Sequence, residues 1–316
     1  MATTENTALL HSAFYRFVPI ADPPATAGAV RALASAQGLR GSIVVAREGI
    51  SGAVAGAPAS VAAFEAALEA ALEATIEAAL PGPRVPVPGT ALRRLAFRHS
   101  ACTSAPFGRL KVSVKPEIVA LGLPQGAGGA PLPSPDDRDA SHLAPPAWRD
   151  LLTRDDVVVL DNRNHFEVRL GRFRGAVDPQ VHNFRDFVAY VEQHAPDWRA
   201  ARRPVAMYCT GGIRCDKTAP WMRGLGLDVY QLEGGILNYL EQMKLGAVSA
   251  GSDWVGECFV FDNRIALDSG LHETATTAVQ VFDAQHPDEA WRLQRAHRLG
   301  ETNEAKEADG ADEAPQ

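Results

Sequence analysis

The sequence predicts a two-domain protein, an α+β domain followed by an α/β domain, and three observations lead to this fold class. The 316 residues are enough for two compact domains, each with its own core. In the first third of the chain, strand and helix patterns follow the order β-α-β-β-α-β. Beyond a segment rich in Gly and Pro, short all-apolar strands alternate with helices, which is typical of a parallel sheet covered on both faces.

The first domain is expected over residues 1–120. We predict its elements from apolar runs and from the Gly and Pro residues that separate them. Strands are expected over residues 14–20, 41–46, 49–56, 92–98 and 110–114, and helices over 25–37 and 61–80. The second helix has apolar residues at spacings of three and four and ends at Pro81-Gly82. This order favours a ferredoxin-like βαββαβ domain.

Residues 121–146 are dense in Gly, Pro, Ser and Asp, and we expect them to form a linker. The second domain is expected over residues 147–245, with strands at 157–160, 205–208 and 229–232 and helices at 187–193 and 217–225. Residues 246–316 are expected to add a short packed extension at 254–262, one helix at 288–299 and an acidic, disordered tail.

The net charge of −7 is unevenly distributed along the chain. Residues 301–316 carry −5, whereas residues 81–116 contain seven Arg and Lys and no Asp or Glu. This acid-free segment is the best candidate for contact with a polyanion. No apolar run reaches the ~18 residues of a membrane span, and the first residues do not resemble a secretory signal. We therefore expect a cytoplasmic protein with free thiols and no metal site.

A reactive cysteine is predicted at the end of an apolar strand. Cys209 is followed by Thr210, Gly211, Gly212, Ile213 and Arg214, and then by a helix. The two glycines let several backbone N–H groups converge on the sulfur, and the helix N-terminus and Arg214 favour its thiolate form. The pattern predicts a nucleophilic or sulfur-carrying thiolate. Cys215 is interpreted as a packing residue, with a resolving thiol as the alternative.

This loop resembles the active-site loop of rhodaneses. Other rhodanese-like signatures are Asp161-Asn162-Arg163, the run from Gly171 to Ala176, and the run from Val229 to Ile236. Cys209 and Arg214 are five positions apart, as in sulfur-carrying relatives, whereas phosphatase relatives have a loop one residue longer. The resemblance implies a rhodanese-type second domain.

More specifically, residues 14 to about 265 resemble the tRNA uridine-34 hydroxylase family. The matching stretches are Arg47–Gly52, Phe107–Lys115, Tyr208–Lys217 and Trp254–Asp262. The resemblance implies oxygen-dependent conversion of uridine-34 in the tRNA anticodon loop to 5-hydroxyuridine, without an established cofactor. No obligate protein partner is evident in the sequence. Many members continue into a Cys-rich segment, whereas this sequence has an acidic tail there.

Basic residues in two parts of the chain are the predicted RNA contacts, because phosphate contacts dominate nucleic-acid affinity. They are Arg47, Arg93, Arg94, Arg109, Lys111, Lys115, Arg163, Arg172 and Arg174. In our hypothesis Cys209 and Arg214 are the catalytic pair: the thiolate adds to C6 of uracil, and Arg214 and the loop N–H groups stabilise negative charge. A persulfide on Cys209 is an open alternative, and sulfur transfer is the rival function. His286, Asp288 and His297 have the residue types of an iron site, but we interpret this as coincidence.

Overall fold

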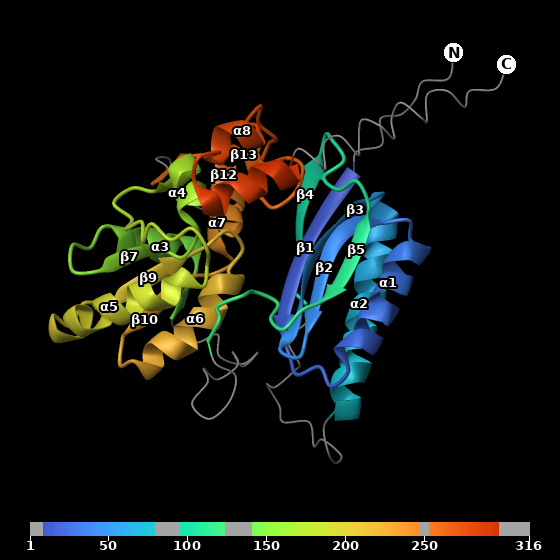
Figure 1. Cartoon of the computed structure of the whole chain (residues 1–316), viewed down its shortest axis with the longest axis horizontal. Coiled ribbons are helices and arrows are strands. Elements are labelled where there is room, and N and C mark those ends of the chain that lie inside the picture. The colour runs from blue at the N-terminus through green and yellow to red at the C-terminus, as the bar shows by residue number, and fades with distance from the viewer. Residues whose placement is uncertain (1–8, 80–94, 124–140, 247–252, 297–316) are drawn as a thin grey trace.

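A computed structural model describes residues 9–79, 95–123, 141–246 and 253–296, which form two main sheets with their helices (Figure 1). The predicted acidic tail, together with Arg93 and Arg94, lies outside the described residues. Within the part of the chain that the structure describes, no helix is both long and apolar enough to cross a membrane.

The first sheet has five strands in the order β4-β1-β3-β2-β5. Its elements are β1 (Leu9–Phe17), α1 (Pro23–Ala36), β2 (Arg40–Ala46), β3 (Gly49–Gly56), α2 (Pro58–Ala79), β4 (Arg98–Cys102) and β5 (Leu110–Val114). The strands β4, β1, β3 and β2 are antiparallel neighbours, as in a ferredoxin-like sheet, and β5 extends the sheet in parallel with β2. The predicted ferredoxin-like order is confirmed, with one strand added.

The strand predicted over residues 92–98, of which 92–94 lie outside the described structure, is wrong in its bounds over the described residues. Leu95 is buried in the core, but pairing with β1 begins only at Arg98 and runs to Cys102. A run of apolar residues indicates burial and not hydrogen-bonded pairing. The segment from Arg98 to Cys102 is largely polar, so its pairing was not predicted from apolar runs.

Both helices of this domain cover the same face of its sheet. Phe64 and Leu68 of α2 and Val30 of α1 pack with Ile43 and Ile50 in one buried cluster. Figure 1 shows α1 and α2 on the side of the sheet that faces away from the second sheet. The opposite face of the sheet is therefore turned toward the second domain.

The second sheet is parallel, with strand order β6-β10-β9-β7. Its strands are β6 (His142–Leu143), β7 (Val158–Asp161), β9 (Val205–Tyr208) and β10 (Val229–Leu232). Helices α5 (Asp186–Ala200) and α6 (Ile213–Gly224) pack in one buried cluster, and α3 (Pro145–Leu152) and α7 (Gly235–Lys244) pack in another. Helices thus cover both faces, as the apolar strands predicted. Strand β6 and the start of α3 lie in the stretch that we expected to be a linker.

The packed part of the C-terminal segment continues beyond the predicted extension at 254–262. Strand β8 (Gly171–Phe173) pairs with β11 (Trp254–Gly256), and helix α4 (His165–Leu170) contacts β12 (Cys258–Phe259) and α8 (Ala278–Val281). Strand β12 in turn pairs with β13 (Ala266–Leu267). Phe166 packs against Phe259, Phe282 and Leu293, and the last of these lies on a helix over residues 287–296. The apolar residues that hold this segment are widely spaced in sequence, so they form no regular pattern from which the packing could be predicted.

Candidate active site around Cys209

Cys209 lies directly after β9, at the carboxyl edge of the parallel sheet, four residues before α6 begins. The intervening loop bends back at Gly212, whose φ of 100° is in the left-handed region that favours glycine. This bend directs the Gly212 N–H at the Cys209 sulfur, with an N···Sγ distance of 3.1 Å. The sequence prediction of a strand-to-helix loop that surrounds the cysteine with N–H groups agrees with this geometry.

The Cys209 thiol is buried but acidic. Burial by itself raises its pKa, but the Cys215 thiol, the Arg214 guanidinium and the backbone N–H groups of residues 214 and 215 lower the pKa to about 6. The pKa of the Cys215 thiol is raised well above its ordinary value, chiefly by burial and by its hydrogen bond to Cys209. Cys215 therefore stays protonated and donates its S–H to the Cys209 thiolate.

Arg214 is held by a carboxylate that the sequence analysis did not single out. Its two terminal nitrogens donate to the two oxygens of Glu167, both at 2.9 Å. Glu167 is fully buried, and it also accepts from the backbone N–H of Asn164 in the capping box of α4. The spacing Asn164-x-x-Glu167 is a capping signal in the sequence, but nothing local connects it to an arginine 47 residues away.

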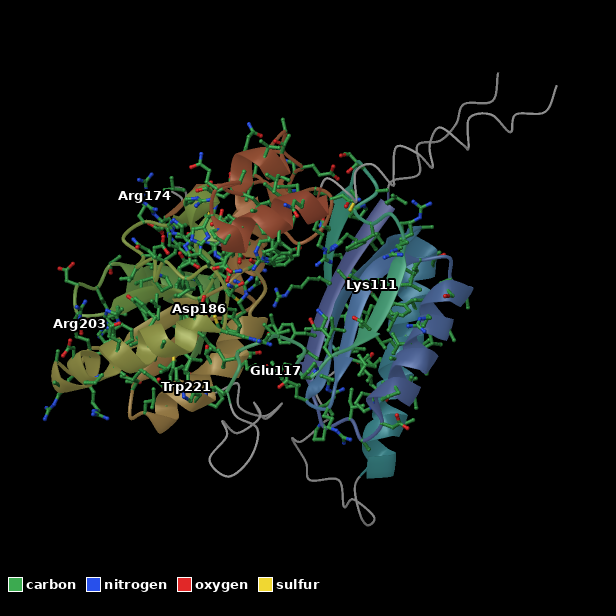
Figure 2. All side chains as sticks on the ribbon, viewed as in Figure 1. Lys111, Glu117, Arg174, Asp186, Arg203 and Trp221 are labelled. Carbon is green, nitrogen blue, oxygen red and sulfur yellow. The ribbon has the colours of Figure 1, made fainter. Side chains whose placement is uncertain are left out.

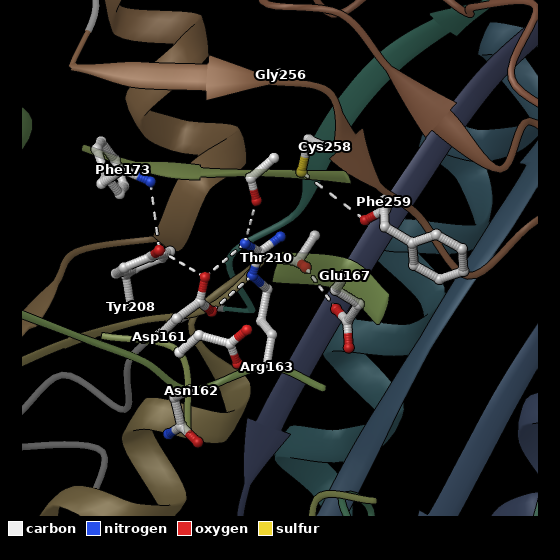
Figure 3. A network of polar contacts seen from close by, with 12 residues as sticks. Asp161, Asn162, Arg163, Glu167, Phe173, Tyr208, Thr210, Gly256, Cys258 and Phe259 are labelled. Atoms are coloured by element: carbon white, nitrogen blue, oxygen red, sulfur yellow. Dashed lines mark hydrogen bonds and ion pairs between the residues drawn. The ribbon is translucent and has the colours of Figure 1, made fainter. Parts of the chain in front are cut away.

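Arg163 is a structural residue and not an accessible basic side chain. It is fully buried, and its guanidinium makes two hydrogen bonds to Asp161, at 2.8 and 2.6 Å (Figure 3). The Tyr208 hydroxyl donates to the same carboxylate at 2.5 Å, and Arg163 also donates to the Gly171 carbonyl. The prediction that Arg163 contacts RNA is therefore wrong, because this arginine fixes β7, β8 and β9 to one another.

The other described basic candidates are exposed. Tyr15, Ser51, Val44 and Ser113 are paired across neighbouring strands, so their side chains share one face of the first sheet, the face opposite the helices. Lys111 and Lys115 are two residues from Ser113 on either side and belong to the same face, which is turned toward the second domain. Arg47 and Arg109 are exposed on the same domain, whereas Arg172 and Arg174 are exposed on the second domain. Figure 2 shows Arg174 on the second domain and Lys111 on the sheet of the first domain. The described candidates thus form two separate groups.

The first domain contacts the cysteine loop directly. The Tyr15 hydroxyl donates to Asp216 on the first turn of α6, at 2.7 Å. Ile213 of the loop packs into an apolar cluster with Phe17 and Ile118. Sequence reasoning missed this junction, because residues on different domains share no local pattern.

A buried lysine strengthens the same junction. Lys217, one residue beyond Asp216, donates to both oxygens of Glu48, to Glu117 and to the carbonyl of Val119, at 2.5–2.9 Å. Figure 2 shows Glu117 where the two domains meet. Helix α6 therefore follows directly on the cysteine loop, and residues of its first two turns anchor it to the first domain.

The His and Asp residues interpreted above as a coincidental iron set lie partly outside the described structure. His286 stacks on His182 with ring centroids 3.6 Å apart, and His297 lies outside the described residues. Among the described residues, no group of three or more His, Cys, Asp or Glu side chains is placed to hold a metal ion.

The fold and the site define a class of protein, a two-domain α/β protein with an activated thiolate at the edge of a parallel sheet. Residues 10–118 match the family described as the UPF0176 acylphosphatase like domain. This match covers the first sheet and its helices.

Several similar proteins are named tRNA uridine(34) hydroxylase, among them the following three. The Deinococcus radiodurans protein is 40% identical over 263 residues, which are 83% of this chain and 77% of that protein. The Nitrobacter winogradskyi protein is 40% identical over 88% of this chain and 98% of its own length. The Ruegeria pomeroyi protein is 42% identical over 83% of this chain and 77% of its own length. The chain belongs to the tRNA uridine(34) hydroxylase family.

Proposed function

We propose that this protein hydroxylates C5 of uridine-34 in tRNA, with molecular oxygen as co-substrate and Cys209 as the catalytic thiolate. The observation that carries the proposal is the buried Cys209 thiol with a pKa of about 6, in a chain similar over most of its length to proteins named for this reaction. A thiolate that is populated at neutral pH is the form that attacks an electrophilic carbon.

The second domain is proposed to be of the rhodanese type. The support is a parallel sheet covered on both faces, with Cys209 at the carboxyl end of β9 and Arg214 five positions later. We propose domain limits of 1–120, about 141–245 and 246–316. The second domain begins earlier than the predicted residue 147, because β6 at His142–Leu143 pairs with β10 of its sheet.

In the proposed reaction the Cys209 thiolate adds to C6 of the uracil, and the electron pair moves onto C5 and the O4 enolate. Oxygen adds at C5, and protonation gives a hydroperoxide. Two thiols of an added reductant cleave its O–O bond, releasing one oxygen as water and forming a disulfide. Loss of the C5 proton expels the Cys209 thiolate and leaves 5-hydroxyuridine. Arg214, held by Glu167, keeps positive charge beside the sulfur, which favours its departure as a thiolate.

The tRNA is proposed to lie on the exposed basic residues of the first domain. Arg47, Arg109, Lys111 and Lys115 are exposed on that domain, and Arg93 and Arg94, which lie outside the described residues, stay predicted contacts. Arg172 and Arg174 supply a second phosphate contact in this proposal. Phosphates bind such surfaces through charge, whereas the unstacked bases of an anticodon loop are free to enter a pocket.

The test is nucleoside mass spectrometry on a tRNA transcript incubated with the protein, a thiol reductant and isotopically labelled oxygen gas. Wild type should add one labelled oxygen atom to uridine-34, and Cys209→Ser should add none. Cys102→Ser, a change at a buried cysteine of the first domain, is the matched control and should retain activity. Product from Cys209→Ser at the wild-type rate would remove the thiolate from the mechanism.

The rival function is sulfur transfer, in which Cys209 carries a persulfide. The same activated thiolate suits it, so the assay is run in parallel with thiosulfate as donor and cyanide as acceptor. If the protein forms thiocyanate and no 5-hydroxyuridine, the proposed hydroxylase function is wrong and sulfur transfer takes its place.

A further inference from the structure

The hydroxyl of Tyr15, on β1 of the first domain, lies on the rim of the cysteine loop. It donates to Asp216 at 2.7 Å, and a Cβ atom placed on Gly212 would lie 2.9 Å from the Tyr15 oxygen. Gly212 is the residue whose N–H group bonds the Cys209 sulfur. The phenol oxygen therefore lies against the loop that holds the thiolate.

The direction of the Tyr15 hydrogen bond is fixed by charge. Burial, the Asp216 carboxylate and the Cys209 charge together raise the pKa of Tyr15 well above its ordinary value, so the phenol stays protonated. Asp216 is an acceptor when ionised, so the O–H proton points at it. The phenol oxygen then has lone pairs left, and it can act toward a ligand only as an acceptor.

The position of this acceptor is rigid. The Tyr15 ring packs with Phe17, Ile118 and Ile213, and the adjacent Lys217 joins α6 to Glu48 and Glu117. An acceptor held in this way cannot turn to suit a different ligand, which is the condition for discrimination by a hydrogen bond.

We propose that Tyr15 determines base specificity by accepting the N3–H of the uracil whose C6 faces Cys209. The inference rests on the proposed function and adds a residue from the first domain to its site. In uracil, N3 carries a hydrogen and lies across the ring from C6, so one base can meet the thiolate at C6 and Tyr15 at N3. Cytosine has a lone pair at N3, which would face the lone pairs of the phenol oxygen.

The test compares uridine-34 with 3-methyluridine-34 in otherwise identical tRNAs assembled by ligation. The methyl group replaces the N3 hydrogen and leaves C5 and C6 open. Wild type should use the methylated substrate with a kcat/KM at least ~100-fold lower, since a site built around a hydrogen bond rejects an analogue that lacks it. Tyr15→Phe, which removes the oxygen alone, should lower kcat/KM on uridine-34 by ~10-fold or more and shrink the ratio between the two substrates toward one.

Two further measurements separate recognition from structure. Tyr190→Phe, a change on α5, is the matched control and should leave both rates and their ratio unchanged. The pH profile of Cys209 alkylation should keep its midpoint within ~0.5 pH unit in Tyr15→Phe. If Tyr15→Phe does not fold, Asp216→Asn replaces it; the neutral amide no longer fixes the phenol proton, so the ratio should shrink there too.

The outcomes are distinguishable. If folded Tyr15→Phe loses equally on both substrates or on neither, the ratio of kcat/KM for uridine-34 to that for 3-methyluridine-34 stays at the wild-type value. That result would overturn the assignment of Tyr15 while leaving hydroxylation established. Absence of product from uridine-34 with wild type would overturn the proposed function and, with it, the base contact.

Discussion

Cys209 is 1% exposed, and its thiol still ionises near neutral pH because donors and one cation surround the sulfur. Among the largest causes that lower this pKa, Arg214 supplies a full positive charge, and Glu167 fixes where that charge lies. At the scale of residues, the proposed chemistry therefore depends on a buried ion pair beside a buried thiolate.

Alkylation of Cys209 by iodoacetamide should follow this ionisation. The thiolate is the reacting form, so the rate should rise with pH, reach half of its plateau at about pH 6 and stay level above pH 7. Mass spectrometry of the Cys209 peptide measures the rate. A midpoint near the ordinary thiol pKa of about 8.5 would contradict the geometry of the loop.

Loss of the Arg214 charge should affect pKa and stability in separable ways. Arg214→Gln should move the alkylation midpoint up by ~1 pH unit or more, because an opposite charge near the thiolate is lost. It should also destabilise the fold by about 3–5 kcal/mol, since Glu167 is left buried without its cation. In the double variant Arg214→Gln/Glu167→Gln, stability measured by urea unfolding should partly return while the midpoint stays high. Recovery of both would show that the charge of Arg214 is unimportant for the thiolate.

At the scale of elements, α6 and the turn between β12 and β13 join the second domain to the first. The α6 contact is made by Lys217, which is 8% exposed and donates to Glu48 and Glu117. The turn contact is made by Arg264, which donates to Ser100 on β4, and by Asp262, which faces His11 on β1. The first sheet is thus held on both sides of the cysteine loop.

Removal of the lysine charge should weaken the α6 contact. Lys217→Met leaves two carboxylates at the junction without their cation and should lower the free energy of unfolding by about 3–5 kcal/mol. Lys217→Met/Glu117→Gln should recover part of this loss. Urea unfolding curves of the full chain give both values, and a loss below ~1 kcal/mol would mean that the buried cluster does not hold the domains.

His11 should make the turn contact sensitive to acid. Burial and the nearby Arg264 lower the pKa of His11 to about 4, whereas an unfolded histidine titrates near 6.5. As pH falls from 6.5 to 4 the unfolded state binds the proton first, so stability is lost over this window, by about 2 kcal/mol at pH 5. His11→Gln should remove this part of the pH dependence of urea unfolding. Identical pH dependence in the variant would show that His11 is not held neutral.

At the scale of the whole molecule, the proposed tRNA surface lies on the first domain and the reacting sulfur on the second. Lys111→Glu and Lys115→Glu should each weaken tRNA binding at 100 mM salt and reduce the slope of log affinity against log salt by about 1. Arg202→Glu, at an exposed residue beyond α5 and outside both basic groups, is the matched control. Filter binding over a range of salt concentrations measures the slope, and equal slopes in all three variants would place the RNA elsewhere.

The sequence alone determined the parts of the protein that depend on local pattern. Strands β3, β5, β9 and β10 have the predicted bounds, because each is an apolar or Gly-punctuated run between turn residues. The Cys209 loop was predictable for the same reason, since a strand, two glycines and a helix are consecutive in the chain. The side chains of Cys209 and Arg214 needed no distant residue to be recognised.

Only the tertiary structure decided which charged and polar residues meet. Arg163 and Lys111 are both basic in the sequence, but one is buried against Asp161 and the other is exposed on the first sheet. The partnerships of Arg214 with Glu167 and of Tyr15 with Asp216 join residues 47 and 201 positions apart. Electrostatic and hydrogen-bond partners are set by distances in space, and no periodicity along the chain encodes them. The sequence therefore predicted Cys209 and its loop as the candidate site, whereas the packing of the two domains decided what surrounds them.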